Sequence, residues 1–126
     1  MKVGNLMISF NNKKYVCLLD FAMDFIRGKW KALILCNLYN EPKRFLELQR
    51  MVEGISQKIL NQNLKELETD GLVYKVVYAE IPPKVEYYLT DKGKEMTKLI
   101  KEFEAWSVKY YPELDGSCES SAKDSN

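Results

Sequence analysis

The chain contains no histidine among its 126 residues. Histidine is the commonest general base, the usual partner of a nucleophilic serine or cysteine, and a ligand in every Cys/His zinc site. The sequence also lacks a glycine-rich loop of the phosphate-binding type, and no nucleophile can be paired with a base beside it. We therefore expect a protein that is not an enzyme and that holds no metal ion or cofactor.

Long hydrophobic runs are missing as well. The longest uninterrupted apolar stretches, Tyr15 to Leu19 and Ala32 to Cys36, are five residues each, whereas a membrane span needs about 20. The three cysteines, at positions 17, 36 and 118, form no CxxC pair, and an odd number cannot all pair within one chain. We expect a cytoplasmic protein in a reducing setting, with no membrane partner and no disulfide framework.

The chain has little net charge, because 19 Lys and Arg residues face 18 Asp and Glu residues. Residues 112–126 hold four acids and one lysine, a net charge of −3, and this leaves +4 on residues 1–111. Such a body neither requires nor excludes a polyanionic partner. The length suits one domain. We expect a loosely held arm at residues 1–14, a folded domain at 15–111, and a disordered acidic tail at 112–126 that includes Cys118.

The spacing of apolar residues predicts a fold of class α+β, mainly α. Helical spacing predicts five helices, at residues 18–26, 30–39, 44–52, 56–70 and 91–111. Ser56 and Thr90 are good N-caps for the last two of these helices. Period-two alternation predicts strands at 72–78 and 84–89, joined by a five-residue tip at 79–83 that contains two prolines.

The helix at 56–70 has two different faces. Its apolar side chains gather on one side: Ile55, Ile59, Leu60, Leu64 and Leu67. Its other side carries hydroxyl, amide and ammonium groups: Ser56, Gln57, Lys58, Asn61, Gln62 and Lys65. Amide side chains pair with adenine edges and lysine with guanine. Because this face lacks acids on a chain rich in glutamate, we predict that these six residues contact DNA bases, the alternative being a solvated helix face.

A helix, a turn and a second polar helix followed by a two-stranded ribbon is the order of a winged helix-turn-helix. In that fold the 56–70 helix enters the major groove of double-stranded DNA. Cations at the helix starts and on the ribbon are predicted phosphate contacts: Lys29, Lys43, Arg44, Lys75 and Lys84.

Five blocks with family-like spacing resemble the signatures of HxlR-type winged-helix transcriptional regulators: Phe25–Trp30, Pro42–Leu48, Gly54–Leu60, Leu64–Leu72 and Ile81–Thr90. The resemblance runs over about residues 17–105. It implies a prokaryotic homodimer that binds inverted-repeat operators. Arg27 departs from the family pattern, where a glycine is usual, and Leu18 replaces a proline. Asn63 stands where the family often has arginine, and the helical wheel turns it inward.

Cys17 aligns with the cysteine that thiol-sensing members of this family use. A thiolate there can be modified or bridged to its equivalent in a second subunit. The alternative is a small apolar residue at the start of a helix. Cys36 lies in an apolar helix, and we expect it to be inert core.

The last helix carries a wide apolar stripe near a 3.5-residue period. We read it as half of a homodimer interface, packed with the first helix. The predicted interface residues are Leu18, Met96, Leu99, Ile100, Phe103, Trp106 and Tyr110. The alternative is an ordinary core helix that folds back on its own domain.

These observations predict a sequence-specific transcriptional regulator that acts as a homodimer. Repression is the simplest mode for a small dimer without an effector domain. One alternative is a winged helix used as a protein-interaction module. Another is a regulator controlled by a small molecule of unknown identity, bound near the dimer junction among Phe25, Trp30, Tyr87 and Trp106.

Overall fold

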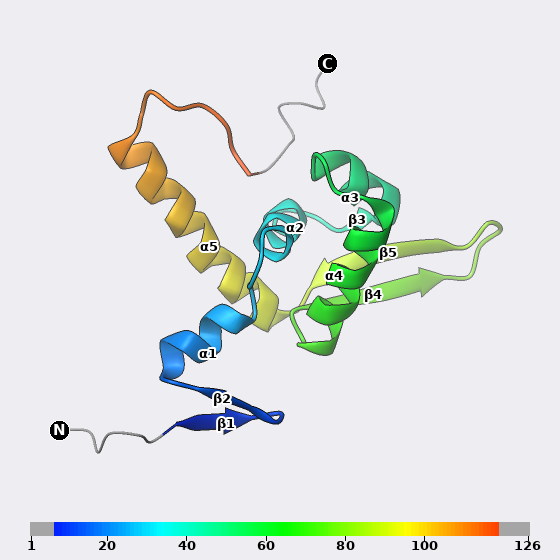
Figure 1. Ribbon diagram of the computed structural model, residues 1–126. Coiled ribbons are helices and arrows are strands. Elements are labelled where there is room, and N and C mark those ends of the chain that lie inside the picture. Colours follow the sequence, from blue (N-terminus) through cyan, green and yellow to red (C-terminus); the bar gives the residue numbers. More distant parts are fainter. Residues whose placement is uncertain (1–6, 119–126) are drawn as a thin grey trace.

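A computed structural model describes residues 7–118 of the chain (Figure 1). Its elements follow in the order β1 (Ile8–Phe10), β2 (Lys13–Tyr15), α1 (Leu18–Asp24), α2 (Trp30–Leu38), β3 (Lys43–Arg44), α3 (Phe45–Met51), α4 (Gln57–Thr69), β4 (Val73–Tyr78), β5 (Lys84–Leu89) and α5 (Asp91–Tyr110). Within residues 7–118, no helix is long and apolar enough to cross a membrane.

Strands β4 and β5 form an antiparallel hairpin, with register from Val73 opposite Leu89 to Tyr78 opposite Lys84. The far end of this hairpin projects away from the helices (Figure 1). The short strand β3 pairs with the other edge of β5, so the strand order is β3-β5-β4. Strand β3 was not predicted from the sequence, because two residues cannot show a period-two pattern.

The hydrophobic core lies between α2, α3, α4, the sheet and the first half of α5. Its fully buried side chains include Ile34, Leu35, Leu48, Leu60, Leu64, Leu67, Leu72 and Val73. The start of α5 approaches the backbone of Leu72 so closely that a Cβ on Gly93 would lie 2.0 Å from the Leu72 carbonyl oxygen. Only glycine fits at this crossing.

The predicted helix caps are confirmed. The Ser56 hydroxyl oxygen accepts a hydrogen bond from the Ile59 amide at 3.1 Å. The Thr90 hydroxyl accepts from the Gly93 amide at 2.9 Å and donates to the Gly71 carbonyl at 2.6 Å, which joins the start of α5 to the end of α4. Helix α1 ends two residues before the predicted end, because its last turn tightens into i→i+3 hydrogen bonds.

Residues 8–15 form a hairpin rather than a loose arm, and the predicted boundary at residue 14 falls inside it. Asn11 and Asn12 both have positive φ, at 50° and 65°, which suits a tight hairpin turn. The hairpin is attached to α1: the Tyr15 hydroxyl donates to Asp24 Oδ2 at 2.6 Å, and the Tyr15 ring meets Phe21 edge to face. Residues 1–6 lie outside the described part of the chain.

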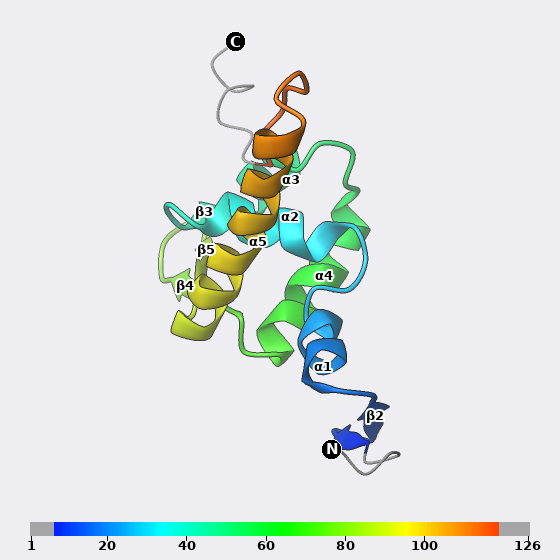
Figure 2. The ribbon, with the colours of Figure 1, turned by 90° about the vertical axis from the view of Figure 1, so that its left-hand side faces the viewer.

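After α5 the chain turns back toward α2 (Figures 1 and 2). The expectation of a disordered tail is wrong for Cys118, which is half-buried against the core. The Cys118 carbonyl accepts from Asn37 Nδ2 at 3.1 Å, and the Cys118 amide donates to Glu104 Oε2 at 2.5 Å. Asn37 and Cys118 are 81 residues apart in the sequence, and the pattern of neighbouring residues gives no indication of a contact between them. Residues 119–126 lie outside the described part.

The pair α3 and α4, followed by the β4–β5 ribbon and the long helix α5, is the expected winged helix-turn-helix. The fold class is α+β and mainly helical. In this arrangement α4 occupies the position of the recognition helix of a winged helix-turn-helix, and the β4–β5 hairpin occupies that of the wing.

Candidate nucleic-acid interface

Helix α4 presents its polar face to solvent and its leucines to the core. Leu60, Leu64 and Leu67 are at most 1% exposed, and this buried stripe sets the rotation of the helix about its axis. The six predicted base-contacting residues are all exposed: Ser56, Gln57, Lys58, Asn61, Gln62 and Lys65. The structure therefore brings them together on one open helical surface, which we call the α4 face.

Two side chains on or near the α4 face make hydrogen bonds to the backbone of the helix itself. Ser56 uses an oxygen lone pair to cap α4, which leaves its hydroxyl proton free to donate. Asn63 is half-buried, and its Nδ2 donates to the Ile59 carbonyl at 2.8 Å. The inward position expected for Asn63 is confirmed.

Lys31 on α2 is a further residue that the sequence analysis did not single out. It is only 8% exposed, and its Nζ lies 2.8 Å from Glu66 Oε1 on α4. The hydrogen bond to Lys31 lowers the pKa of Glu66, and burial opposes this shift. The ion pair neutralises an acid next to Gln62 and Lys65. A single lysine among the mainly apolar residues of α2 was the available sequence signal.

The predicted phosphate contacts at the helix starts divide into two groups. Lys29 and Arg44 are exposed. Lys43 is only 8% exposed, and its ammonium bonds to Glu41, at 3.2 Å from the carbonyl oxygen and 3.5 Å from the carboxylate. Strand β3 places Lys43 opposite the buried Tyr87, on the core side of the sheet. The structure does not bring Lys43 to the surface, where a phosphate contact would need it.

The two wing lysines lie on opposite faces of the ribbon. Lys75 pairs with Tyr87 and Lys84 pairs with Tyr78. Paired residues share a face of an antiparallel ribbon, and successive residues alternate between faces. Lys75 therefore shares the face of the buried Tyr87, whereas Lys84 lies 4.5 Å from the centre of the Tyr78 ring on the other face. The two ammonium groups leave the wing in different directions.

A tyrosine cluster on the Lys84 face of the wing was also missed. The rings of Tyr74 and Tyr88 are stacked with centroids 5.2 Å apart. The hydroxyls of Tyr78 and Tyr88 lie 2.8 Å apart, and Tyr88 also donates to Glu86 at 3.1 Å. These hydrogen bonds, Tyr78 first, raise the pKa of Tyr88, so the hydroxyl stays protonated. The cluster links the two strands of the wing.

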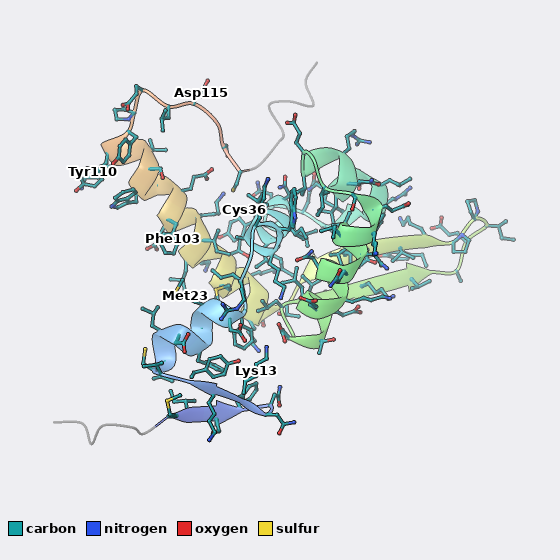
Figure 3. All side chains as sticks on the ribbon, viewed as in Figure 1. Lys13, Met23, Cys36, Phe103, Tyr110 and Asp115 are labelled. Carbon is teal, nitrogen blue, oxygen red and sulfur yellow. The ribbon has the colours of Figure 1, made fainter. Side chains whose placement is uncertain are left out.

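The predicted dimer surface is exposed except at its inner edge. Leu18 is 72% exposed, Phe103 70% and Trp106 56%, and Leu99 and Tyr110 are also exposed. Figure 3 shows Phe103 and Tyr110 along α5, across the molecule from the wing. Ile100 is buried in the core of its own domain and Met96 is half-buried there, because α5 packs one side against α2. These two residues do not belong to the exposed stripe.

Cys17 is exposed and stands at the N-cap of α1, where its carbonyl accepts from the Phe21 amide at 3.1 Å. Val16 and Leu18 beside it are exposed apolar side chains. The cysteine therefore lies at the edge of the predicted dimer surface.

The four aromatic residues proposed for a small-molecule pocket are not brought together. An open cavity of about 710 Å³ lies between the N-terminal hairpin, α1 and α5, and its apolar lining includes Phe10, Phe21, Phe25 and Met96. Trp30, Tyr87 and Trp106 do not line it. Tyr87 is buried in the sheet, whereas Trp106 lies far along α5, packed against Tyr110.

The exposed polar helix α4, the two-stranded wing and the long helix α5 define the class of winged-helix transcriptional regulators. The sequence matches the HxlR-like helix-turn-helix family over residues 25–115, and the chain belongs to this family. The family's helix-turn-helix implies that the protein binds DNA. The family and its relatives are transcriptional regulators, a class that does not consist of enzymes.

Among the relatives is an HTH-type transcriptional regulator of Methanothermobacter thermautotrophicus, 40% identical over 106 residues, which cover 84% of this chain and 81% of the relative. The regulator YkvN of Bacillus subtilis is 44% identical over 103 residues, covering 82% of this chain and 86% of YkvN.

Two solved structures of regulators resemble this fold. The redox regulator HypR in its oxidized form has a TM-score of 0.71 and 36% identity, covering 79% of this chain and all of HypR. The reduced form of the transcriptional regulator YodB from B. subtilis has a TM-score of 0.66 and 36% identity, covering 78% of this chain and 96% of YodB.

Proposed function

We propose that this transcriptional regulator binds a specific DNA sequence through the α4 face and acts in the cytoplasm as a homodimer on an inverted-repeat operator. The observation that carries this proposal is the exposure of all six polar side chains on one side of a helix whose other side is fully buried. A rigid helix that offers amides and ammonium groups to the major groove can read base edges.

Contacts to the phosphates set the register of the helix on the duplex. Lys29 lies before α2 and Arg44 immediately before α3, and both are exposed. With the wing lysines Lys75 and Lys84, they are the cations we assign to the DNA backbone. Lys43 is left out because Glu41 holds its ammonium.

The exposed stripe of α5 supports the homodimer. Leu99, Phe103, Trp106 and Tyr110 form a surface that a soluble monomer would leave in water, and contiguous apolar patches of this kind mark association sites. A two-fold axis along α5, with Leu18 of α1 at the margin, gives an isologous interface. Two recognition helices about 34–36 Å apart then meet successive major grooves.

The proposal includes repression as the direction of control. A small dimer that covers a promoter blocks access to it without any further surface. We therefore assign repression as the direction of control.

Thiol sensing through Cys17 is part of the proposal. HypR is described as a redox regulator, and Cys17 is exposed next to Leu18, which belongs to the predicted dimer surface. Two Cys17 thiols of a dimer that lose their hydrogens to a peroxide give one disulfide and two waters. Such a bond fixes the two α1 helices and changes the spacing of the recognition helices.

The test is a selection of bound duplexes from a random DNA library at ~150 mM salt, where non-specific binding is weak. We expect a two-fold-symmetric site with half-sites about one helical turn apart. Enrichment of no sequence would refute recognition of DNA by the α4 face and favour a protein-interaction module.

The same selection, repeated on peroxide-treated protein, tests thiol sensing. The treated protein should no longer enrich the site, whereas the treated Cys17→Ser variant should still enrich it. Equal loss of enrichment in both proteins would remove Cys17 from the proposal.

A further inference from the structure

The chain beyond α5 returns to the helical core (Figure 1), and Cys118 is the last residue that the structure describes. Three contacts hold this residue. Its carbonyl accepts from Asn37 Nδ2 on α2 at 3.1 Å, its amide donates to Glu104 Oε2 on α5 at 2.5 Å, and its Sγ donates to Glu104 Oε1 at 3.7 Å. Backbone and side chain of Cys118 are therefore both positioned against two helices.

The side chain beneath Cys118 is another cysteine. Cys36 lies on α2, is only 1% exposed, and belongs to the hydrophobic core cluster against which Cys118 packs. Cys36 is also close enough to the Cys118 thiol to raise the pKa of that thiol. Because Asn37 is the next residue after Cys36, the bond from Asn37 to the Cys118 carbonyl fixes the backbone beside the thiol pair.

We propose that Cys36 and Cys118 are a redox-active pair that closes into an intramolecular disulfide and fastens residues 111–118 to α2. Covalent closure needs the two sulfurs to approach to about 2 Å. The segment that carries Cys118 is exposed up to Ser117, so it can supply this movement. The pair is separate from Cys17, and the proposal does not depend on DNA recognition.

The oxidant we assign is a peroxide. Cys118 is the more exposed thiol, so its sulfur attacks the peroxide first: an S–O bond forms, the O–O bond breaks, and one water leaves. The Cys36 sulfur then attacks the Cys118 sulfur, the S–S bond forms, and the sulfenic oxygen leaves as a second water. Two thiols are oxidised and one hydrogen peroxide is reduced to two waters.

Glu104 is a positioning residue for this reaction. Interaction with Cys36, burial, and the negative charge of Glu104 raise the pKa of the Cys118 thiol, whereas Lys101 lowers it. The thiolate is the reactive form. The arrangement therefore makes the pair slow to react at neutral pH and faster as the pH rises.

Closure joins the last described segment to a helix in the centre of the protein. Helix α2 packs against both α4 and α5. A cross-link between residues so far apart in sequence removes much freedom from the unfolded chain. The oxidised protein should therefore resist unfolding more than the reduced protein does.

The test uses the full chain with Cys17→Ser, so that only the proposed pair carries thiols. After peroxide treatment we expect the number of free thiols in denaturant to fall from two to none, with the chain still monomeric on a denaturing gel without reductant. Chymotryptic cleavage after Tyr110, where the next residue is not proline, should leave the C-terminal peptide attached to the peptide that contains Cys36 until reductant is added. Disulfides between chains, or oxygen addition at Cys118 with Cys36 still free, would refute the proposal.

A matched variant keeps Cys36 and removes its partner. In Cys17→Ser/Cys118→Ser, the single buried thiol should stay titratable after the same peroxide treatment. Loss of the Cys36 thiol at the original rate would show that Cys118 takes no part. Since Cys118 lies at the edge of the core, this variant avoids the cavity that a change at Cys36 would create.

A second measurement tests Glu104. In the Cys17→Ser background, Glu104→Gln should speed disulfide formation several-fold at neutral pH and shift the pH midpoint of the rate downward. Glu102→Gln, which changes an exposed carboxylate on the same helix, should leave both unchanged. An unaltered pH profile in Glu104→Gln would refute its positioning role.

Discussion

The ammonium of Lys31 lies 2.8 Å from the carboxylate of Glu66, and this ion pair joins α2 to the recognition helix. Lys31 is almost fully buried, whereas the Glu66 side chain is about half exposed at 49%. If one member of a buried ion pair is removed, the charge of the remaining member stays desolvated and has no opposite charge to compensate for it. Placement of the α4 face therefore depends in part on a lysine that points into the protein.

The first prediction concerns this pair. Glu66→Gln should lower the free energy of unfolding by about 1 kcal/mol at pH 7, because Glu66 stays partly in water and its pairing is screened. The pKa of Glu66 is lowered from its ordinary value of 4.5, so the contribution is complete above that value and is lost as the pH falls through the folded-state pKa. Urea unfolding at pH 7 and pH 3 should show a larger difference between the two proteins at pH 7 than at pH 3. An equal difference at both pH values would contradict the pairing.

A second prediction concerns the N-terminal hairpin. Asp24 accepts from the Tyr15 hydroxyl and from Arg27 Nε, each at 2.6 Å. These bonds, Tyr15 first, lower the pKa of Asp24 from 3.8 to about 2, so the contact is complete above pH 3.8 and lost as the pH falls through about 2. Asp24→Asn should increase amide hydrogen exchange in β1 and β2 several-fold at pH 7. Tyr15→Phe, which deletes one bond, should have a smaller effect; the reverse order would show that Asp24 does not anchor the hairpin.

The third prediction concerns the α4 face. Lys58→Ala and Gln62→Ala should each weaken binding to the selected operator by about 1–3 kcal/mol if they read bases. Lys75→Ala should instead weaken all DNA alike and reduce the salt slope by about 1. Fluorescence anisotropy titrations at several salt concentrations separate the two behaviours. Lys94→Ala, an exposed lysine on α5, is the control and should change neither. Full operator affinity in both α4 variants would remove α4 from the interface.

The fourth prediction concerns oligomeric state. Trp106→Glu places a charge in the middle of the exposed stripe of α5 and should weaken the dimer at least 10-fold, which corresponds to about 1.4 kcal/mol. Light scattering over a dilution series measures this change. Ala105→Glu adds the same charge to another side of the helix and should leave the dimer intact. If the Trp106→Glu protein remains dimeric at every dilution, the interface lies elsewhere.

The sequence by itself determined those features whose causes are local. The alternation of leucines and polar residues over α4, with Ser56 and Gly71 at its ends, is sufficient to specify the helix and its two faces. The same holds for the wing, where β-branched and aromatic residues alternate up to the prolines of the tip. Such periodicities and caps act within a few residues of each other, so they can be read without knowledge of the rest of the fold.

Only the tertiary structure decided which of these surfaces meet. Lys43 and Arg44 are neighbours with similar charge, yet the pairing of β3 with β5 buries one and leaves the other exposed. Ile100 and Phe103 belong to one apolar stripe, but the packing of α5 on α2 divides it between core and surface. Cys118 packs against the core cluster that contains Cys36 because the chain turns back toward α2 after α5. These contacts arise from packing between segments distant in sequence, and no pattern of neighbouring residues contains that information.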